Sequence, residues 1–227
     1  GTNFTNSLLV GTDSTGTLSS ANANTGVGIG VLGALTTGDC NVAVGFEALD
    51  INTTGSQNVA IGAVALDTNT TGSKNVAIGM YALDSNTTAS CNVSIGYNSS
   101  QANTTGTLNV AVGLNALTTN TTANANTAIG SNALLANTTG NNNVAVGCGA
   151  LDSNTTASSN TAVGQGALAA NTTSINNTAV GRVAANKTTT GCQNVAIGTF
   201  AHCVNTTGDN NVAIGVCSLC SSTTVDA

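Results

Sequence analysis

The sequence has few charged residues, few aromatic residues and no proline. Charged residues occupy 5% of the 227 positions and aromatic residues 2%, and Trp is absent. Three Lys and Arg residues against nine Asp and Glu residues leave no basic stripe, so we expect no binding to nucleic acid. The lack of proline fits a body of continuous backbone pairing, because a missing N–H would interrupt the pairing.

Long apolar runs are also missing. None approaches the roughly 20 residues that are needed to cross a bilayer, so we expect no membrane-spanning segment. The chain begins with neither a signal peptide nor Met, and we expect it to be a mature or excerpted stretch of a longer product.

Catalytic patterns are lacking as well. The chain has one His, no repeating pair of nucleophile and base, and no paired carboxylates at a fixed spacing. The glycine-rich run from Gly26 to Gly30 resembles part of a dinucleotide fingerprint, but no helix-forming segment follows it. We therefore predict a protein that is not an enzyme and has no cofactor.

What the sequence does contain is one phrase at a fixed interval of 17 residues. The phrase reads Asn, Val or Thr, Ala or Ser, Val or Ile, and Gly. Its eleven copies begin at Asn41, Asn58, Asn75, Asn92, Asn109, Asn126, Asn143, Asn160, Asn177, Asn194 and Asn211. Such a period indicates stacked units, none of which can bury its apolar face alone. We number the positions of each unit from 1, the Asn, to 17.

The pattern within a unit predicts an all-β fold. Side chains alternate along a strand, so Val42 and Val44 should face one way and Ala43 the other. Position 4 is always Val or Ile, and we predict that this column is the core. Position 5 is always Gly, which predicts a corner that other residues cannot adopt. β-branched residues, Asn and Gly stand where a helix would need a 3.6-residue apolar stripe.

The rest of the unit predicts a second strand and a second corner. An apolar pair, such as Ala48 and Leu49, follows the first corner, and a Leu column recurs at position 9 with lapses at Ser100, Ala185 and His202. Asn-Thr-Thr follows, and it favours a turn. We therefore predict a parallel β-solenoid, or β-roll, of 17-residue coils with two short strands and two turns each. Residues 1–40 should form irregular leading coils, and residues 41–227 regular ones.

The phrase Asn-Val-Ala-Ile-Gly, followed by a small residue and a Gly-bearing turn, resembles the head repeats of trimeric autotransporter adhesins of the YadA type. Similar repeats occur in phage and viral fibre proteins. The resemblance covers about residues 24–219. It implies a left-handed parallel β-roll that associates in threes as part of an extracellular fibre.

The Asn-Thr-Thr corners match the acceptor pattern for N-linked glycosylation. A column of sugars would give a nearly uncharged stack a hydrophilic cover, so we predict N-linked glycans there. The alternative is a ladder in which each amide stacks on its equals above and below. Matches at other positions of the repeat occur at Asn3, Asn92, Asn98, Asn176 and Asn186. The nine corner residues are Asn52, Asn69, Asn86, Asn103, Asn120, Asn137, Asn154, Asn171 and Asn205.

Position 3 should face away from the Val and Ile core by alternation, and an apolar stripe of that extent usually means contact. We predict that it is a self-association face, formed by Ala43, Ala60, Ala77, Ala111, Ala128, Ala145, Ala162, Ala179, Ala196 and Ala213.

The seven Cys residues do not by themselves fix the compartment. Cys203 and Cys220 stand one unit apart, so on rungs about 4.8 Å apart they are within reach of a disulfide. A zinc site is disfavoured because the one Cys-x-x-Cys, Cys217 to Cys220, has no matching half. Its ligands would come from Cys192, His202, Cys203, Cys217 and Cys220.

These observations predict a structural component of an extracellular, cell-surface or virion-surface fibre that associates with itself and carries N-linked glycans. An adhesin or a viral or phage fibre head that binds a host surface is the alternative. An ice-binding protein ranks third, because the known pattern places Thr-x-Thr on a strand, whereas the Thr residues here are neighbours in sequence.

Overall fold

The structure is a computed structural model that describes residues 7–11 and 20–221. It divides into two compact units, residues 1–109 and 110–227, called here the N-terminal and C-terminal units. The described residues form strands, turns and bends, and no helix. Each unit is a parallel β-solenoid in which one strand recurs every 17 residues. The predicted fold class is confirmed.

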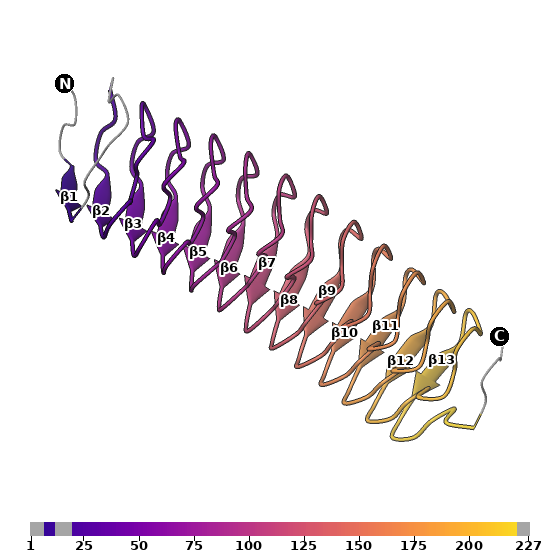
Figure 1. Ribbon diagram of the computed structural model, residues 1–227. Helices are drawn as coiled ribbons and strands as arrows, with labels where there is room; N and C mark the ends of the chain where they lie inside the picture. The colour runs from indigo at the N-terminus through magenta and orange to yellow at the C-terminus, as the bar shows by residue number, and fades with distance from the viewer. Residues whose placement is uncertain (1–6, 12–19, 222–227) are drawn as a thin grey trace. The chain divides into compact units, whose positions relative to one another are not determined.

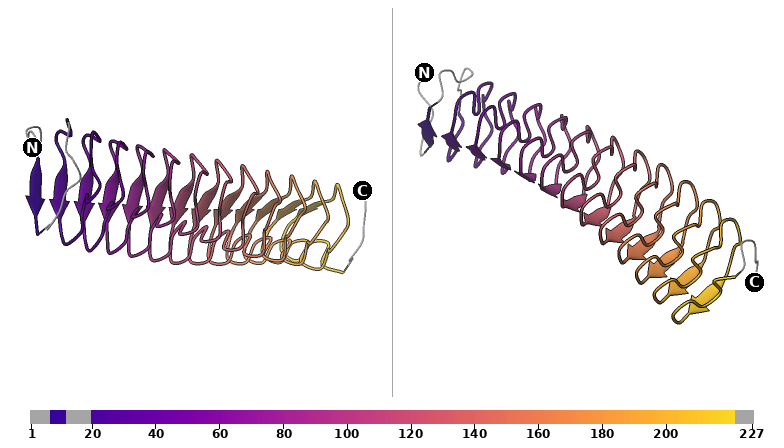
Figure 2. Two further views of the ribbon diagram at one scale, coloured as in Figure 1. Left: turned by 45° about the horizontal axis from the view of Figure 1, so that its top comes forward. Right: turned by 60° about the horizontal axis from the view of Figure 1, so that its bottom comes forward.

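The N-terminal unit stacks its strands in chain order with a shift of one repeat, so that Ala43 pairs with Ala60 and Ala77 with Ser94. Figure 1 shows these strands side by side, and Figure 2 shows that they line one side of the coils. The strands are β1 (Leu8–Val10), β2 (Thr25–Val27), β3 (Val42–Val44), β4 (Val59–Ile61), β5 (Val76–Ile78) and β6 (Val93–Ile95).

The C-terminal unit repeats this arrangement, with Ala128 paired to Ala145 and Ala162 to Ala179. Its strands are β7 (Val110–Val112), β8 (Thr127–Ile129), β9 (Val144–Val146), β10 (Thr161–Val163), β11 (Thr178–Val180), β12 (Val195–Ile197) and β13 (Val212–Ile214).

The leading residues follow the same register. β1 and β2 pair with Val10 opposite Val27, and β2 pairs with β3 in the same way. Leu32 lies in the Leu column and is fully buried. Residues 20–40 therefore continue the coils that follow them.

The second strand predicted for each coil is absent from the described residues, where turns and bends replace it. Ala150 and Leu151 are adjacent and both fully buried, which strict alternation along a strand does not allow. Both side chains reach the interior because Leu151 has a left-handed backbone, with φ of 52°. Hydrogen bonds between coils persist here, since Leu151 N–H donates to the carbonyl of Ala167 at 3.0 Å.

The glycine corner at position 5 is confirmed. Gly113 has φ of +140°, and a Cβ built on it would lie 2.6 Å from the carbonyl carbon and oxygen of Gly130 in the next coil. Both the conformation and the close approach exclude a side chain.

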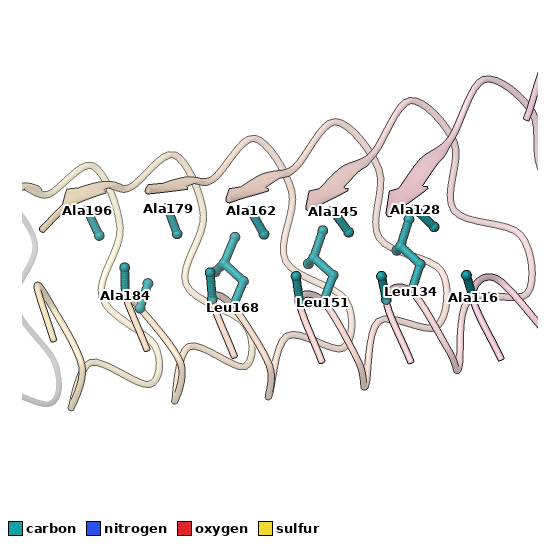
Figure 3. Close-up of a cluster of buried hydrophobic side chains, with 14 of the residues drawn as sticks. Ala116, Ala128, Leu134, Ala145, Leu151, Ala162, Leu168, Ala179, Ala184 and Ala196 are labelled. Carbon is teal, nitrogen blue, oxygen red and sulfur yellow. The ribbon is translucent and has the colours of Figure 1, made fainter. Parts of the chain in front are cut away.

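The prediction that the Val and Ile of position 4 form the core is wrong. The Ala residues of position 3 point inward, and Figure 3 shows Ala128, Ala145 and Ala162 facing Leu134 and Leu151 across a thin interior. These five residues are fully buried. By contrast, Ile129, the position 4 residue that follows Ala128 in β8, is 39% exposed. The alternation was predicted correctly, but its inner face was not. A larger residue at position 3 would push the two sides of the coil apart, so Ala is the residue that fits.

Candidate functional site

Two ladders of asparagine run inside the coils, and the first occupies position 1. The Nδ2 of Asn143 donates to the Oδ1 of Asn126 at 3.1 Å, and that oxygen also accepts the backbone N–H of Asn143 at 2.9 Å. The same contacts recur between Asn41 and Asn58 in the N-terminal unit. All of these residues are fully buried. The sequence analysis gave this Asn no role, although its presence in every copy was the available signal.

The second ladder occupies position 12, at the Asn-Thr-Thr corner. Asn137 Nδ2 donates to Asn120 Oδ1 at 3.2 Å, and Asn154 Nδ2 donates to Asn137 Oδ1 at 2.8 Å. Thr188 takes the Asn position in one coil, and its hydroxyl donates to the carbonyl of Asn205 at 3.3 Å. The amide ladder that we weighed against glycosylation is therefore present.

A carbonyl at position 15 links the two ladders in most coils. The Gly55 oxygen accepts Nδ2 of Asn41 at 3.0 Å and Nδ2 of Asn52 at 2.9 Å. Asn41 thus uses one N–H along the stack, toward Asn24 Oδ1, and the other within its coil. Buried polar groups in a fully satisfied network of this kind specify one arrangement of the backbone.

The positions predicted to carry glycans are the members of the second ladder. All have exposed fractions of 0% or 1%. In Asn69, the Nδ2 donates to Asn52 Oδ1 and to the Gly72 carbonyl, at 2.9 and 3.0 Å. Both N–H groups of this nitrogen are therefore engaged in the folded coil. The residues in question are Asn52, Asn69, Asn86, Asn103, Asn120, Asn137, Asn154, Asn171 and Asn205.

The residues that match the glycosylation pattern at other positions of the repeat differ in burial. Asn92 is fully buried in the first ladder. Asn98 and Asn186 are half-buried, and Asn176 is exposed. Asn3 lies outside the described residues.

The predicted self-association face is contradicted by burial, because the Ala residues of position 3 line the interior with exposed fractions of 0% or 1%. Residues in that place cannot contact a second chain in the folded protein. They are Ala43, Ala60, Ala77, Ala111, Ala128, Ala145, Ala162, Ala179, Ala196 and Ala213.

The outward face of the strands carries the β-branched residues instead. Position 4 is always Val or Ile, and position 2 is Val or Thr, so neither column contains a charge. Ile61 in the N-terminal unit is 38% exposed, and Ile129 and Val180 in the C-terminal unit are 39% and 37% exposed. We call these two columns the outer strand face.

A ridge of variable residues follows the glycine corner, at positions 6 and 7. All four described aromatic residues lie there, together with the one Met, which is exposed. The rings of Tyr81 and Tyr97 meet edge to face with centroids 6.1 Å apart, and the Arg182 guanidinium lies 5.2 Å from the Phe200 ring centroid. We call positions 6 and 7 the corner ridge.

The two neighbouring Thr residues of each second corner do different things. At position 13, the hydroxyl of Thr138 donates to the carbonyl of Thr155 in the next coil at 3.1 Å. At position 14, Thr139 is exposed. The two hydroxyls therefore do not form one flat outward array.

Cys203 and Cys220 lie on adjacent coils with their Sγ atoms 3.2 Å apart, and both thiols are free. Burial, and next the neighbouring Cys220, raises the pKa of the Cys203 thiol. The disulfide remains a prediction.

His202 occupies the Leu column, where burial lowers its pKa, and its Nδ1 has no hydrogen-bond partner among the described residues. Within the described coils, no group of three or more His, Cys, Asp or Glu side chains is placed to hold a metal ion.

Acidic residues stack at position 10 of three consecutive coils in the N-terminal unit. Burial raises the pKa of the middle carboxyl, Asp67, to about 6. The charges of Asp50, Asp84 and Glu47 raise it further in the same direction. Burial also raises the pKa of Asp84.

Residues 7–11 and 20–221 enclose no detected pocket. The same part of the chain has no helix of the length and apolar character that a membrane span requires. Comparisons of the chain with protein-family models, curated proteins and solved structures found no match.

Proposed function

We propose that the chain is a structural segment of a fibre at an extracellular, cell or virion surface, and that it associates with itself through the outer strand face. The observation that carries the proposal is the uncharged β-branched surface of each unit, formed by two columns that never contain Asp, Glu, Lys or Arg. Contiguous apolar surface of this kind marks a contact site more often than a face exposed to water.

The interior supports a structural role. Most coils add the same set of contacts, namely a buried Ala, a buried apolar pair and two amides that share a carbonyl. Stability in such stacks is approximately a sum of equal contributions from neighbouring coils. The ladders are neutral, so salt should weaken them little compared with ion pairs.

A second copy of this chain is the partner that we propose for the outer strand face. Its columns would match the rung spacing of about 4.8 Å, so β-branched side chains could interdigitate along the whole face as they do between packed sheets. The resemblance to YadA-type head repeats and to phage and viral fibre repeats favours a trimer of left-handed rolls.

Sedimentation of a charged variant tests the proposal. Ile129→Glu with Val180→Glu places carboxylates on the outer strand face, where both parent residues are exposed. We expect an oligomeric parent and a folded, monomeric variant, because association would bury unpaired charge. Thr139→Glu with Thr190→Glu adds the same charge to exposed threonines elsewhere and should remain oligomeric. A monomeric parent, or equal masses for all three proteins, would refute the proposal.

Host-surface binding is the second candidate function, and the corner ridge favours it. Tyr, Phe, Met and Arg are enriched where proteins bind one another, and among the described residues they lie on the corner ridge of each unit. Binding of the chain to intact host cells should fall when Met80 and Tyr97, both exposed, are changed to Ala. Unchanged binding would exclude the N-terminal part of the ridge as the contact.

A further inference from the structure

Folding and N-linked glycosylation compete for the same nitrogen atoms in this chain. Asn-x-Thr occurs at nine corners, and the Asn of each is buried in the second ladder. Asn92 adds a tenth buried acceptor through Asn92-Val93-Ser94, and its Nδ2 donates to the Gly106 carbonyl at 2.9 Å.

The chemistry of glycosyl transfer makes the competition strict. The amide nitrogen attacks the anomeric carbon of an oligosaccharide carried on a lipid pyrophosphate. An N–C bond forms as the C–O bond to pyrophosphate breaks, the lipid pyrophosphate leaves with the bonding electron pair, and the nitrogen loses one proton. At Asn137 both protons are already used, toward Asn120 Oδ1 and the Gly140 carbonyl. A sugar there would remove one bond and would need space inside the coil.

We infer that this chain folds in a place where the machinery of N-linked glycosylation does not reach it. The transferase acts on chains that have not yet folded, so it would meet the acceptors before the ladders close. A modified corner then could not close the ladder. The inference concerns folding alone and stands whether or not the chain associates through the outer strand face.

The thiols point in the same direction. All seven cysteines are free, and Cys40, Cys91 and Cys148 are exposed. Exposed unpaired thiols are typical of proteins that fold in a reducing compartment, whereas small secreted domains usually pair their cysteines.

The coil offers a matched control, because the Thr that completes each corner acceptor is separate from the ladder. That Thr stands at position 14 and is exposed, so its replacement by Ala abolishes the acceptor and leaves the Asn in place. Ser94→Ala removes the tenth acceptor and restores the Ala found in the other copies. The corner changes are Thr54, Thr71, Thr88, Thr105, Thr122, Thr139, Thr156, Thr173 and Thr207, each to Ala.

The test compares the full chain with this variant, which lacks the ten buried acceptors and keeps those at Asn3, Asn98, Asn176 and Asn186, in two settings. In the bacterial cytosol, which lacks the transferase, both should give protease-resistant protein with a β-type circular dichroism spectrum. In a eukaryotic secretory pathway, behind an added secretion signal, we expect the parent to carry glycans at the corners and its protease-resistant yield to be at least about tenfold lower than that of the variant. An inhibitor of lipid-linked oligosaccharide synthesis should raise the parent's yield to that of the variant.

Three results would overturn the inference. The secreted parent could be protease-resistant with sugars on the corner Asn residues, which would mean that the coil accommodates them. It could be protease-resistant with those residues unmodified, which would mean that folding is faster than transfer. The variant and the inhibitor-treated parent could fail in the secretory pathway as the untreated parent does, which would mean that sugars are not the obstacle.

Discussion

Asn126 and Asn137 donate to the same oxygen, the carbonyl of Gly140, at 2.9 and 3.0 Å. One residue precedes a strand and the other opens a turn, so the shared acceptor ties the two corners of the coil together. Because both amides also continue a ladder, this coil is fixed both across its width and to its neighbours.

Removing one amide from the second ladder should destabilise the C-terminal unit. Asn137→Ala deletes the bonds to Asn120 and Gly140 and leaves Nδ2 of Asn154 without its 2.8 Å acceptor. We expect a loss of about 2 to 4 kcal/mol, since buried polar groups would be left unpaired. The urea midpoint measures the loss, and Thr139→Ala on the adjacent exposed surface should change it little. Equal midpoints would mean that the ladder contributes little to stability.

Charge should be tolerated on one face of β8 and not on the other. Ala128→Glu buries a carboxylate at a position with 0% exposure and should unfold several coils, at a cost of several kcal/mol. Ile129→Glu, at a position 39% exposed, should keep the β-type circular dichroism spectrum. The reverse result would place the Ala column outside.

The two kinds of glycine with positive φ should respond differently to the same change. Gly113→Asn places a Cβ 2.6 Å from the backbone of Gly130 and should cost at least about 2 kcal/mol. Gly149→Asn meets open space, and the corresponding Asn132 already has φ of 57°, so thermal unfolding should barely shift. Equal melting temperatures for the two variants would mean that a clash with the next coil is not the reason for glycine at the corner.

Acid should stabilise the N-terminal unit. The pKa of Asp67 is raised from 3.8 to about 6, chiefly by burial, so its stabilising contribution is complete below pH 3.8 and is lost as the pH rises through 6. Lowering the pH from 7.5 to 5 should raise the free energy of unfolding by on the order of 1 kcal/mol, after allowance for solvent screening of a half-exposed carboxyl. Asp67→Asn should flatten this dependence, because it removes the carboxyl whose pKa is raised.

Oxidation should join the last described coils. The Sγ atoms of Cys203 and Cys220 are 3.2 Å apart, and a disulfide-exchange reagent such as glutathione disulfide would take up their two electrons and two protons. Peptide mapping should recover one crosslink between these residues, and the melting temperature of the C-terminal unit should rise. Cys203→Ser should abolish both effects, whereas Cys91→Ser, far along the chain, should not. A crosslink from Cys220 to any other cysteine would contradict the predicted pair.

The period of 17 residues was sufficient to predict the fold class. A strand pattern that recurs without a slip can bury its apolar side chains only by stacking in register, and the pairing of Ala43 with Ala60 shows that register. The corner at Gly113 and the buried Leu column at Leu134 could also be predicted, because each follows from one residue type at one position.

The orientation of each strand could not be predicted in the same way. Alternation states that Val144 and Val146 share a face, but it does not state which face is inside. The Val and Ile column has the larger apolar side chains, and hydrophobicity alone assigned it to the core. The buried amide of Asn143 lies on the same face as Ala145, and this pairing of a small residue with a constant Asn was the signal for a narrow, hydrogen-bonded interior.

The sequence by itself determined the repeat, its register and its glycine corner, because these depend on local backbone chemistry and on a spacing that every coil must share. Tertiary structure alone decided which side of the strand is buried and which amide nitrogens are engaged in hydrogen bonds. Those outcomes depend on the width left between the two sides of a closed coil, where Ala43 and Leu49 are fully buried and where the buried Asn52 donates to the Gly55 carbonyl.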